Sequence, residues 1–137
     1  MNITSPQTRI KLPIIQLFEL TCNCRNFARY MSSDQVKDLS FIEDTCSFTI
    51  ENMAKVTLKI LEKTPFTQIR YVAENDKKIP LFLTLNYTAV TENETDVKVD
   101  MDIDVPIFLK PLIQKPLERF METLSEKIKN NVEKKEL

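Results

Sequence analysis

The stretch DVKVDMDIDVPIFLKPLIQKPLERFMETLSEKIKN, residues 96–130, changes its hydrophobic period near its middle. In the first half, apolar residues alternate with mostly charged ones, which is typical of a strand with one buried and one solvated face. In the second half, the apolar residues fall within about 120° of a helical wheel, which predicts a helix with a wide core-facing stripe. The strand positions are Val97, Val99, Met101, Ile103 and Val105, and the stripe is Leu117, Phe120, Met121, Leu124 and Ile128, continued by Val132.

Two prolines limit where this helix can begin. Pro111 and Pro116 would each remove a hydrogen bond from a helix that ran straight on from residue 107. We therefore expect a short turn over 107–114 and a main helix from about 115, with 116–131 lying across the sheet. The stripe needs an apolar partner, and the inner face of the predicted sheet is the only large one that the sequence offers.

The chain before this stretch predicts more strands of the same kind. Between residues 36 and 105 apolar and polar residues alternate, which favours an antiparallel sheet. The predicted strands are 36–42 and 45–51 around a Glu43–Asp44 turn, then 54–63, 67–74, 80–90 and 96–105. Their inward positions before residue 96 are Val56, Leu58, Ile60, Ile69, Tyr71, Ala73, Leu81, Leu83, Leu85, Tyr87 and Ala89.

The N-terminal part predicts one short strand followed by helix. Residues 5–12 fit the strand, and Pro13 fits the first turn of a helix, where its missing N–H costs nothing. The helical pattern runs over 14–31, and we expect Asn23 to break it into two short helices. The inner positions of this segment are Ile14, Leu17, Phe18, Phe27 and Met31.

The last hairpin can be predicted at the level of residue pairs. Its inward residues are odd-numbered on both strands, so the numbers of two paired residues must add up to an even sum. A three-residue loop, Glu92–Asn93–Glu94, satisfies this rule and pairs Leu85 with Met101 and Tyr87 with Val99. A two-residue loop would give an odd sum and turn one apolar face to water, so we expect the longer loop.

Length, composition and charge predict one ordinary domain over residues 1–137. The chain is 42% hydrophobic and 28% charged with a net charge of −1, which favours a globular protein without the basic footprint of nucleic-acid binding. Its N-terminus lacks an apolar signal core and no apolar run reaches transmembrane length, so we expect a cytoplasmic protein that is not integral to a membrane. Three cysteines without framework spacing favour reduced thiols.

Two residue types are absent, and their absence excludes whole classes of enzyme. Without histidine there is no Ser-His or Cys-His nucleophile pair and no two-histidine zinc helix. Without glycine there is no P-loop, dinucleotide fingerprint or nucleophile elbow, so no cofactor is predicted. Tight turns are expected to rely on Asn and Asp, which tolerate left-handed backbone better than most residues.

The order of these elements resembles the START/polyketide-cyclase-like superfamily (SRPBCC) over residues 4–132. The segments that carry the resemblance are TDVKVDMDIDV, residues 95–105, and IFLKPLIQKPLERFMETLSEKI, residues 107–128. The resemblance implies an α+β helix-grip fold, in which a curved antiparallel sheet of six to seven strands grips a long C-terminal helix, with two short helices after the first strand. It also implies a hydrophobic cavity between helix and sheet; members of the family bind lipids, polyketides or isoprenoids, some are cyclases, and others bind proteins. Glycine, which usually relieves the hairpins and lids of the family, is missing here.

The candidate ligand site follows from intersecting the two periods near the middle of each element. Its residues are Leu58, Ile69, Tyr71, Leu85, Tyr87, Met101, Leu117, Met121 and Leu124. A ligand held there is expected to be apolar and uncharged over most of its length, because no inward charge is available to pair with one. The two tyrosine hydroxyls either orient that ligand or bond the rim or the backbone, and the two methionines either line a cavity or fill the core.

Other polar clusters in the sequence predict no catalytic or metal site. Asp100, Asp102 and Asp104 point to the solvated face at a period of two. Cys22, Cys24 and Cys46 are a poor zinc set without histidine, and we expect free thiols.

Three classes of function remain. The first is binding of a small hydrophobic, lipid- or polyketide-like molecule in a cavity between the sheet and the C-terminal helix. The second is a protein-interaction or structural module with a filled core, binding a protein partner or a second copy. The third is a cyclase-type enzyme, for which Arg29 and Arg70 are the only ionisable side chains worth testing as inward groups. An open cavity of several hundred Å³ would favour the first class, and a packed interior the second.

Overall fold

A single antiparallel sheet forms one layer of the protein. The structure is a computed structural model that describes residues 1–26, 36–43, 45–50 and 54–136. The strands run in the order β1-β8-β7-β6-β5-β4-β3, with β2 also pairing β8, and every pairing is antiparallel in the described part of the chain. The strands are β1 Asn2–Thr4, β2 Thr8–Ile10, β3 Val36–Ile42, β4 Thr45–Ile50, β5 Ala54–Thr64, β6 Gln68–Asn75, β7 Leu81–Thr91 and β8 Glu94–Ile103.

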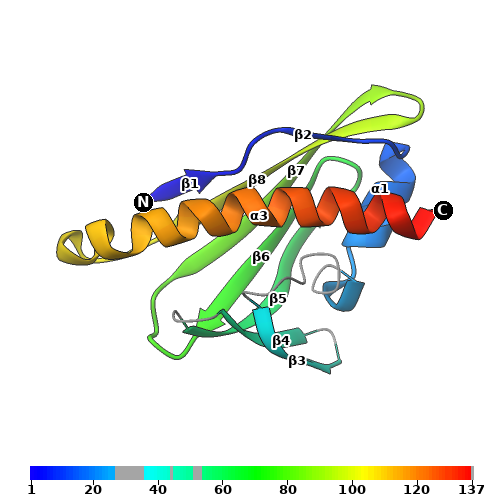
Figure 1. Ribbon diagram of the computed structural model, residues 1–137. Helices are drawn as coiled ribbons and strands as arrows, with labels where there is room; N and C mark the ends of the chain where they lie inside the picture. The colour runs from blue at the N-terminus through cyan, green and yellow to red at the C-terminus, as the bar shows by residue number, and fades with distance from the viewer. Residues whose placement is uncertain (27–35, 44, 51–53, 137) are drawn as a thin grey trace.

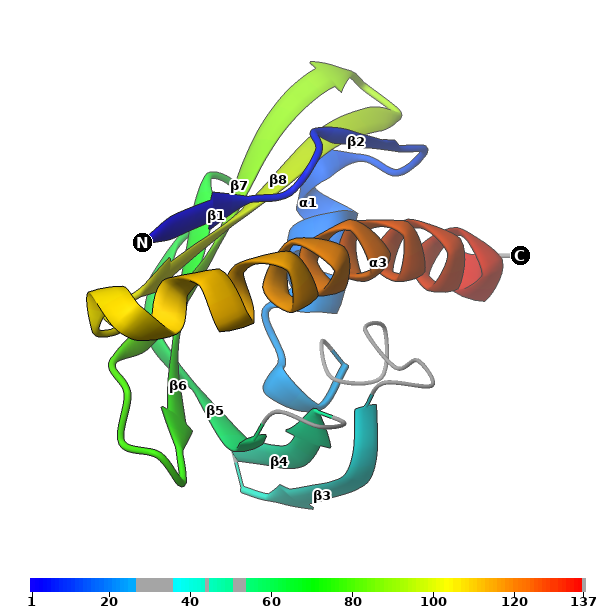
Figure 2. The same cartoon turned by 60° about the vertical axis from the view of Figure 1, so that its left-hand side comes forward.

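A long helix, α3 (Lys110–Glu136), lies across the inner face of this sheet. The sheet curves around the helix, as Figure 1 and Figure 2 show from two sides. The apolar stripe predicted for the helix is buried, whereas Glu118, Glu122 and Glu126 between its members are exposed. The predicted α+β helix-grip fold is confirmed, and the sheet has eight strands in the described part of the chain, rather than six to seven, because the first strand is divided in two.

The start of α3 differs from the prediction. A 3₁₀ turn over Ile107–Leu109 leads straight into the helix at Lys110, so Pro116 stands inside the helix rather than at its beginning. Proline at 111 falls in the first turn, where no N–H is needed. Pro116 leaves the carbonyl of Leu112 without its usual helical donor, but both residues are exposed, so water can bond that carbonyl.

The first strand also differs, because it is interrupted. Instead of one strand over 5–12, β1 and β2 pair with two separate parts of β8. Between them lies Pro6, which has no N–H to donate to a neighbouring strand. Ser5 bridges the gap: its backbone N–H donates to the carbonyl of Val99 at 2.8 Å, and its hydroxyl accepts from the Val99 N–H at 2.9 Å.

The β7–β8 hairpin keeps the predicted faces but not the predicted pairs. Leu85 pairs with Val99, two residues away from the expected partner, and Thr91 pairs with Glu94 across a two-residue turn. The register shifts between Ala89 and Thr91, so that Ala89 pairs with Thr95. The extra residue in β7 means that paired residues beyond the shift again have numbers with an even sum, although the turn has only two residues. The predicted faces are confirmed and the predicted three-residue loop is wrong, because a β-bulge supplies the extra residue that the longer loop was expected to supply.

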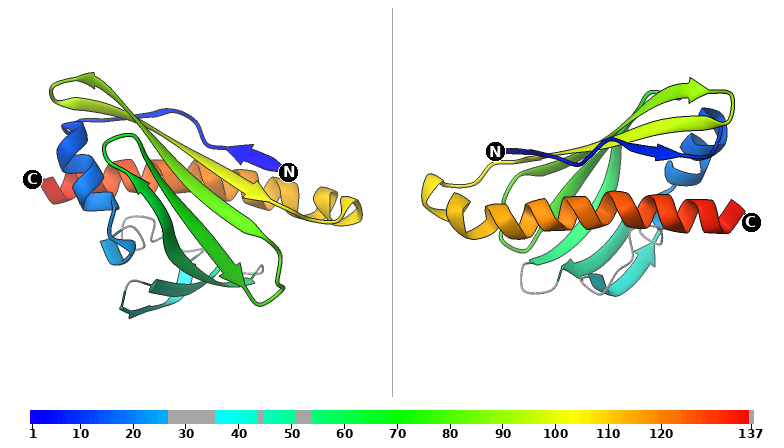
Figure 3. Two further views of the ribbon diagram at one scale, coloured as in Figure 1. Left: turned by 180° about the vertical axis from the view of Figure 1, so that it is seen from behind. Right: turned by 45° about the horizontal axis from the view of Figure 1, so that its top comes forward.

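Helix α1 (Ile14–Thr21) covers the end of the sheet that lies near the C-terminus. It packs near the C-terminal end of α3, whereas the start of α3 lies at the opposite end of the molecule (Figure 3). Leu17 and Phe18 are buried as predicted. The chain turns helical again at 24–26, where the Asn23 side chain accepts from the backbone N–H of Asn26, in agreement with the predicted break. Two further predicted inner positions, 27 and 31, lie outside the described residues.

Four of the described residues adopt positive φ, in a chain without glycine. Asp38 does so inside β3, where the register shifts, and Glu43, Phe66 and Lys78 do so at turns, with φ between 53° and 63° in all four. Only the first belongs to the Asn/Asp pair that we expected to occupy such positions. The Phe66 ring makes an edge contact with the Phe18 ring, with centroids 5.5 Å apart, so tertiary packing holds at least this turn in the left-handed region.

Candidate functional site

An apolar cavity of about 200 Å³ lies between the first half of α3 and one end of the sheet. Its described lining side chains are apolar except for Asn75 and Lys77. The lining residues are Phe48 and Ile50 of β4, Val56 and Leu58 of β5, Ala73 and Asn75 of β6, Lys77 and Ile79 of the β6–β7 turn, Leu81 and Leu83 of β7, Met101 and Ile103 of β8, and Leu112, Ile113, Pro116, Leu117 and Phe120 of α3.

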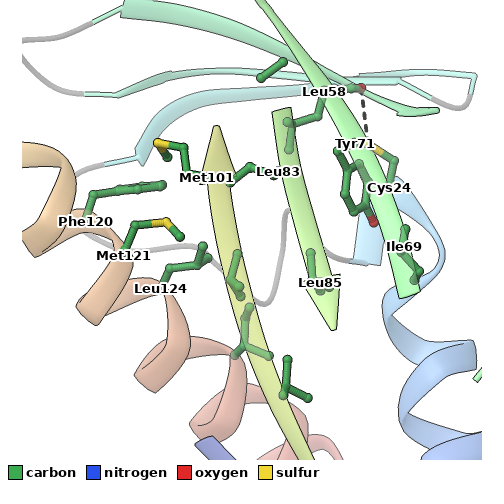
Figure 4. Close-up of a cluster of buried hydrophobic side chains, with 14 of the residues drawn as sticks. Cys24, Leu58, Ile69, Tyr71, Leu83, Leu85, Met101, Phe120, Met121 and Leu124 are labelled. Carbon is green, nitrogen blue, oxygen red and sulfur yellow. Dashed lines mark hydrogen bonds between the residues drawn. The ribbon is translucent and has the colours of Figure 1, made fainter. Parts of the chain in front are cut away.

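The cavity has a buried end and an exposed end. Leu58, Met101 and Phe120 are buried and form the inner wall. Figure 4 shows Phe120 reaching from α3 toward Met101 on β8. At the outer end, Leu112 is 71% exposed and Lys77 is also exposed. The opening therefore lies between the first turn of α3 and the β6–β7 turn.

The β6–β7 turn is held in place by one side chain, Asn75. Its amide nitrogen donates to the carbonyl of Ile79 at 2.7 Å, and its amide oxygen accepts from the Ile79 N–H at 3.1 Å. The backbone N–H of Lys78 donates to the Asn75 carbonyl at 3.1 Å. Asn75 is therefore committed to the turn, and Lys77 is the one ionisable side chain among the lining residues that the structure describes. It makes no ion pair or side-chain hydrogen bond with any described residue.

The nine residues predicted for the ligand site are all buried, but they do not all meet at the cavity. Leu58, Met101 and Leu117 line it. The other six pack in the interior without lining it, and they are Ile69, Tyr71, Leu85, Tyr87, Met121 and Leu124. The cavity thus lies toward one end of the fold, away from the middle where the two periods intersect.

The two tyrosine hydroxyls are used by the protein itself. Tyr71 donates to the backbone carbonyl of Thr21 at 2.9 Å, and the Tyr87 hydroxyl lies 2.6 Å from the Thr21 hydroxyl. Burial raises the pKa of both tyrosines, so both hydroxyls stay protonated at neutral pH. Of the alternatives that the sequence left open, the bond to the backbone applies to Tyr71.

Helix α1 explains why the cavity is displaced from the middle. The ring of Phe18 contacts that of Tyr87 edge to face, with centroids 5.5 Å apart, and the last residue of α1 bonds both tyrosines. This helix therefore covers Tyr71 and Tyr87, and the apolar cavity lies toward the opposite end of the sheet. The periodicity of strands and of α3 carries no information about where α1 docks. The sequence offers one signal for the position of the cavity: Leu112 is apolar but lies outside the predicted stripe of α3. In the structure it is exposed and lines the cavity.

The remaining polar clusters lie away from the cavity. Asp100 accepts from the Thr4 hydroxyl and the Asn86 amide, and Asp102 accepts from the Asn2 amide. Asp96, expected on the solvated face, is buried instead. Its carboxylate bonds Arg9 at 2.9 Å, and that bond lowers the pKa of Asp96. None of these aspartates is among the lining residues.

Of the two arginines proposed as inward groups, the one that the structure describes, Arg70, does not line the cavity. The Arg70 guanidinium lies 4.6 Å from the ring centroid of Phe82, and neither residue lines the cavity. The second candidate, at position 29, lies outside the described residues.

Two of the three free cysteines form a buried pair. The sulfur atoms of Cys24 and Cys46 lie 3.0 Å apart, and their mutual hydrogen bond together with burial raises the pKa of Cys46. This keeps the Cys46 side chain a neutral thiol. Among the described residues no three Cys, Asp or Glu side chains come together as a set of metal ligands.

Comparison with solved structures places this geometry among known folds. A START superfamily protein from Mycobacterium smegmatis superposes with a TM-score of 0.73 at 12% identity, covering 97% of each chain. The protein has a START-like helix-grip fold. A protein from Thermus thermophilus has a similar structure, with a TM-score of 0.76, 17% identity and 96% and 97% of the two chains covered. A conserved protein from Geobacillus kaustophilus gives a TM-score of 0.74 at 10% identity, with 98% and 96% covered.

The sequence comparisons return nothing. No protein-family profile matches this chain, and no curated protein matches it. In the described part of the chain, no helix combines the length and the apolar character that crossing a bilayer requires.

Proposed function

We propose that the protein binds a small, largely apolar molecule in the cavity under the first half of α3. The observation that carries this proposal is the cavity itself: an opening to solvent leads into a space whose walls are almost entirely apolar. Interiors are normally packed without voids of this size, so such a space has a cost in stability that a ligand can offset. The START-like fold supports the proposal, because a helix laid across a curved sheet can leave an apolar space between them.

The volume limits the size of the ligand. A cavity of about 150 Å³ lined by apolar side chains holds benzene, which corresponds to roughly 25 Å³ for each carbon atom. The cavity of about 200 Å³ therefore encloses an aliphatic segment of about eight carbons. It is smaller than the roughly 300–1,000 Å³ of sites for drug-sized molecules. We propose a ligand of medium chain length, or the end of a longer one whose remainder stays outside.

The proposed contacts are those of the cavity rather than of the whole interior. Leu58, Met101 and Leu117 are proposed to touch the ligand, as the sequence predicted. The other six predicted residues support the site from behind as packed core. Ala73 is the smallest residue in the lining, so it leaves the most room for a substitution that fills the space.

Titration with 1-octanol tests the proposal. Binding is measured by calorimetry, and native mass spectrometry of freshly purified protein looks for a bound molecule of matching size. We expect one molecule of octanol per chain for the wild type and a loss of at least about tenfold in affinity for Ala73→Leu, because leucine occupies the space of about three carbons of the ligand. Ala89→Leu is the matched control, since Ala89 is exposed near the end of β7 and does not line the cavity.

Two results would contradict the proposal. One is a wild type that binds no octanol and carries no molecule after purification. The other is equal octanol binding by the wild type and by a folded Ala73→Leu variant, which would place binding elsewhere.

A second function, association of two copies, is favoured by a separate observation. Ile107, Phe108 and Leu112 form an apolar patch at the start of α3, with 82%, 74% and 71% of their surface exposed. Sedimentation velocity at increasing protein concentration tests it: a dimer that Phe108→Ser dissociates supports this function, and a monomer at every concentration refutes it.

A further inference from the structure

The β6–β7 turn places a cation at the edge of the apolar cavity, and this limits the chemistry of the ligand. Lys77 is exposed and lines the cavity, whereas the inner wall opposite the opening consists of Leu58, Met101 and Phe120. A ligand that enters with an apolar end first leaves its other end beside Lys77. From sequence alone we expected no charge at the site; the structure shows one at its rim.

We propose that the ligand is a medium-chain aliphatic carboxylate, bound with its tail inward and its carboxylate paired with Lys77. This proposal rests on the proposed function and adds the chemistry of the head group. A carboxylate buried at the inner end would have no partner and would be costly, so the polar end must lie at the opening. There the head group stays partly in water and gains the ammonium as its partner.

The local structure makes the rim of the cavity positively charged, which favours an anionic head group. Asn75 uses its amide to hold the turn, so Lys77 is set at the rim by a fixed backbone while its own ammonium keeps no partner among the described residues. The turn carries Asp76, Lys77 and Lys78, which gives one net positive charge, in a chain whose net charge is −1. Among the described lining residues none is acidic, so none of them would repel an anion.

The size and the position of the charge together set the length of the ligand. The cavity encloses about eight carbons. We therefore expect octanoate to reach the inner wall with its carboxylate at the opening, and much longer chains to extend past Leu112 into solvent.

The test compares three probes of equal length: octanoate, 1-octanol and octylamine. Calorimetric titrations use the wild-type protein, Lys77→Met and Lys78→Met, the last being the matched control because Lys78 occupies the same turn but does not line the cavity. We expect Lys77→Met to weaken octanoate binding about fivefold, as an exposed ion pair of about 1 kcal/mol implies, while octanol affinity stays within about twofold. Lys78→Met should weaken octanoate binding much less. The octanoate effect should shrink as NaCl is raised from low to molar concentration, because salt screens an exposed pair.

The outcomes separate this inference from the proposed function. If octanol binds but Lys77→Met leaves octanoate affinity unchanged, or changes it no more than Lys78→Met does, the head-group inference is overturned and the apolar site stands. Octylamine that binds the wild type more tightly than octanoate also overturns it. If none of the three probes binds, the proposed function itself fails.

Discussion

Filling the cavity should make the empty protein more stable, which is the opposite of what most core substitutions do. In Ala73→Leu, three added carbons enter a space of about 200 Å³ and occupy roughly 75 Å³ of it. Each buried carbon contributes about 0.8 kcal/mol, and fixing the leucine side chain costs about 0.5–1 kcal/mol. We therefore expect the free energy of unfolding to rise by about 1.5 kcal/mol. Urea denaturation of ligand-free protein measures it as a higher midpoint with an unchanged slope.

The comparison variant is Leu85→Trp, at a fully buried position that does not line the cavity. There the added volume has no space to enter, so overpacking should lower the free energy of unfolding by about 1–3 kcal/mol. Opposite signs for the two variants are the expected result. If Ala73→Leu destabilises the protein as much as Leu85→Trp does, the space beside residue 73 is filled in solution and the reasoning fails.

Three further predictions concern stability elsewhere in the fold. Phe120→Ala should lower the free energy of unfolding by about 3 kcal/mol, the lower end of the range for buried aromatics, because one side of the ring already faces the cavity. Asp102→Ala, at an exposed position, should change the free energy of unfolding by less than about 0.5 kcal/mol. Equal urea midpoints for the two variants would refute the assignment of faces. Tyr71→Phe should cost about 1–2 kcal/mol, since the last carbonyl of α1 loses its donor, and an unchanged midpoint would show that α1 does not depend on this bond. The bond to Arg9 lowers the pKa of Asp96, so the contribution of Asp96 to stability is present above its unfolded pKa and is lost as pH falls through its folded pKa. Asp96→Asn should therefore be less stable than the wild type at neutral pH, and the difference in stability should vanish in acid. An equal difference in neutral and in strongly acidic buffer would contradict this.

The residues that each strand and helix turns toward the core could be predicted, because they follow from the hydrophobic repeat along that strand or helix. A strand alternates with period two and a helix with period 3.6, so the inward positions of β5 to β8 and the stripe of α3 follow from the order of residues alone. The structure buries that stripe and most of those strand positions, with Ile60 and Leu81 half-buried. The one exposed position is Ala89, which lies near the end of β7, next to the bulge.

The register of the last hairpin and the start of α3 could not be predicted in the same way. A bulge at Val90 adds one residue to a strand without any change in hydrophobic pattern, because an exposed extra residue alters no face. Pro116 is a helix-breaking residue by its local chemistry, yet the burial of Leu117 and Phe120 just beyond it outweighs one lost hydrogen bond at a solvated position.

The order of residues is enough to predict which residues face the core, that the sheet is antiparallel and that a long helix covers it, since each of these depends on a repeat over neighbouring residues. The place where space remains between helix and sheet depends instead on how distant segments pack. Helix α1 docks at one end of the sheet, where Thr21 forms hydrogen bonds with the hydroxyls of Tyr71 and Tyr87. The cavity lies at the other end, beside Lys77. A cavity is the volume that packing fails to fill, so it depends on contacts between distant segments and has no period of its own.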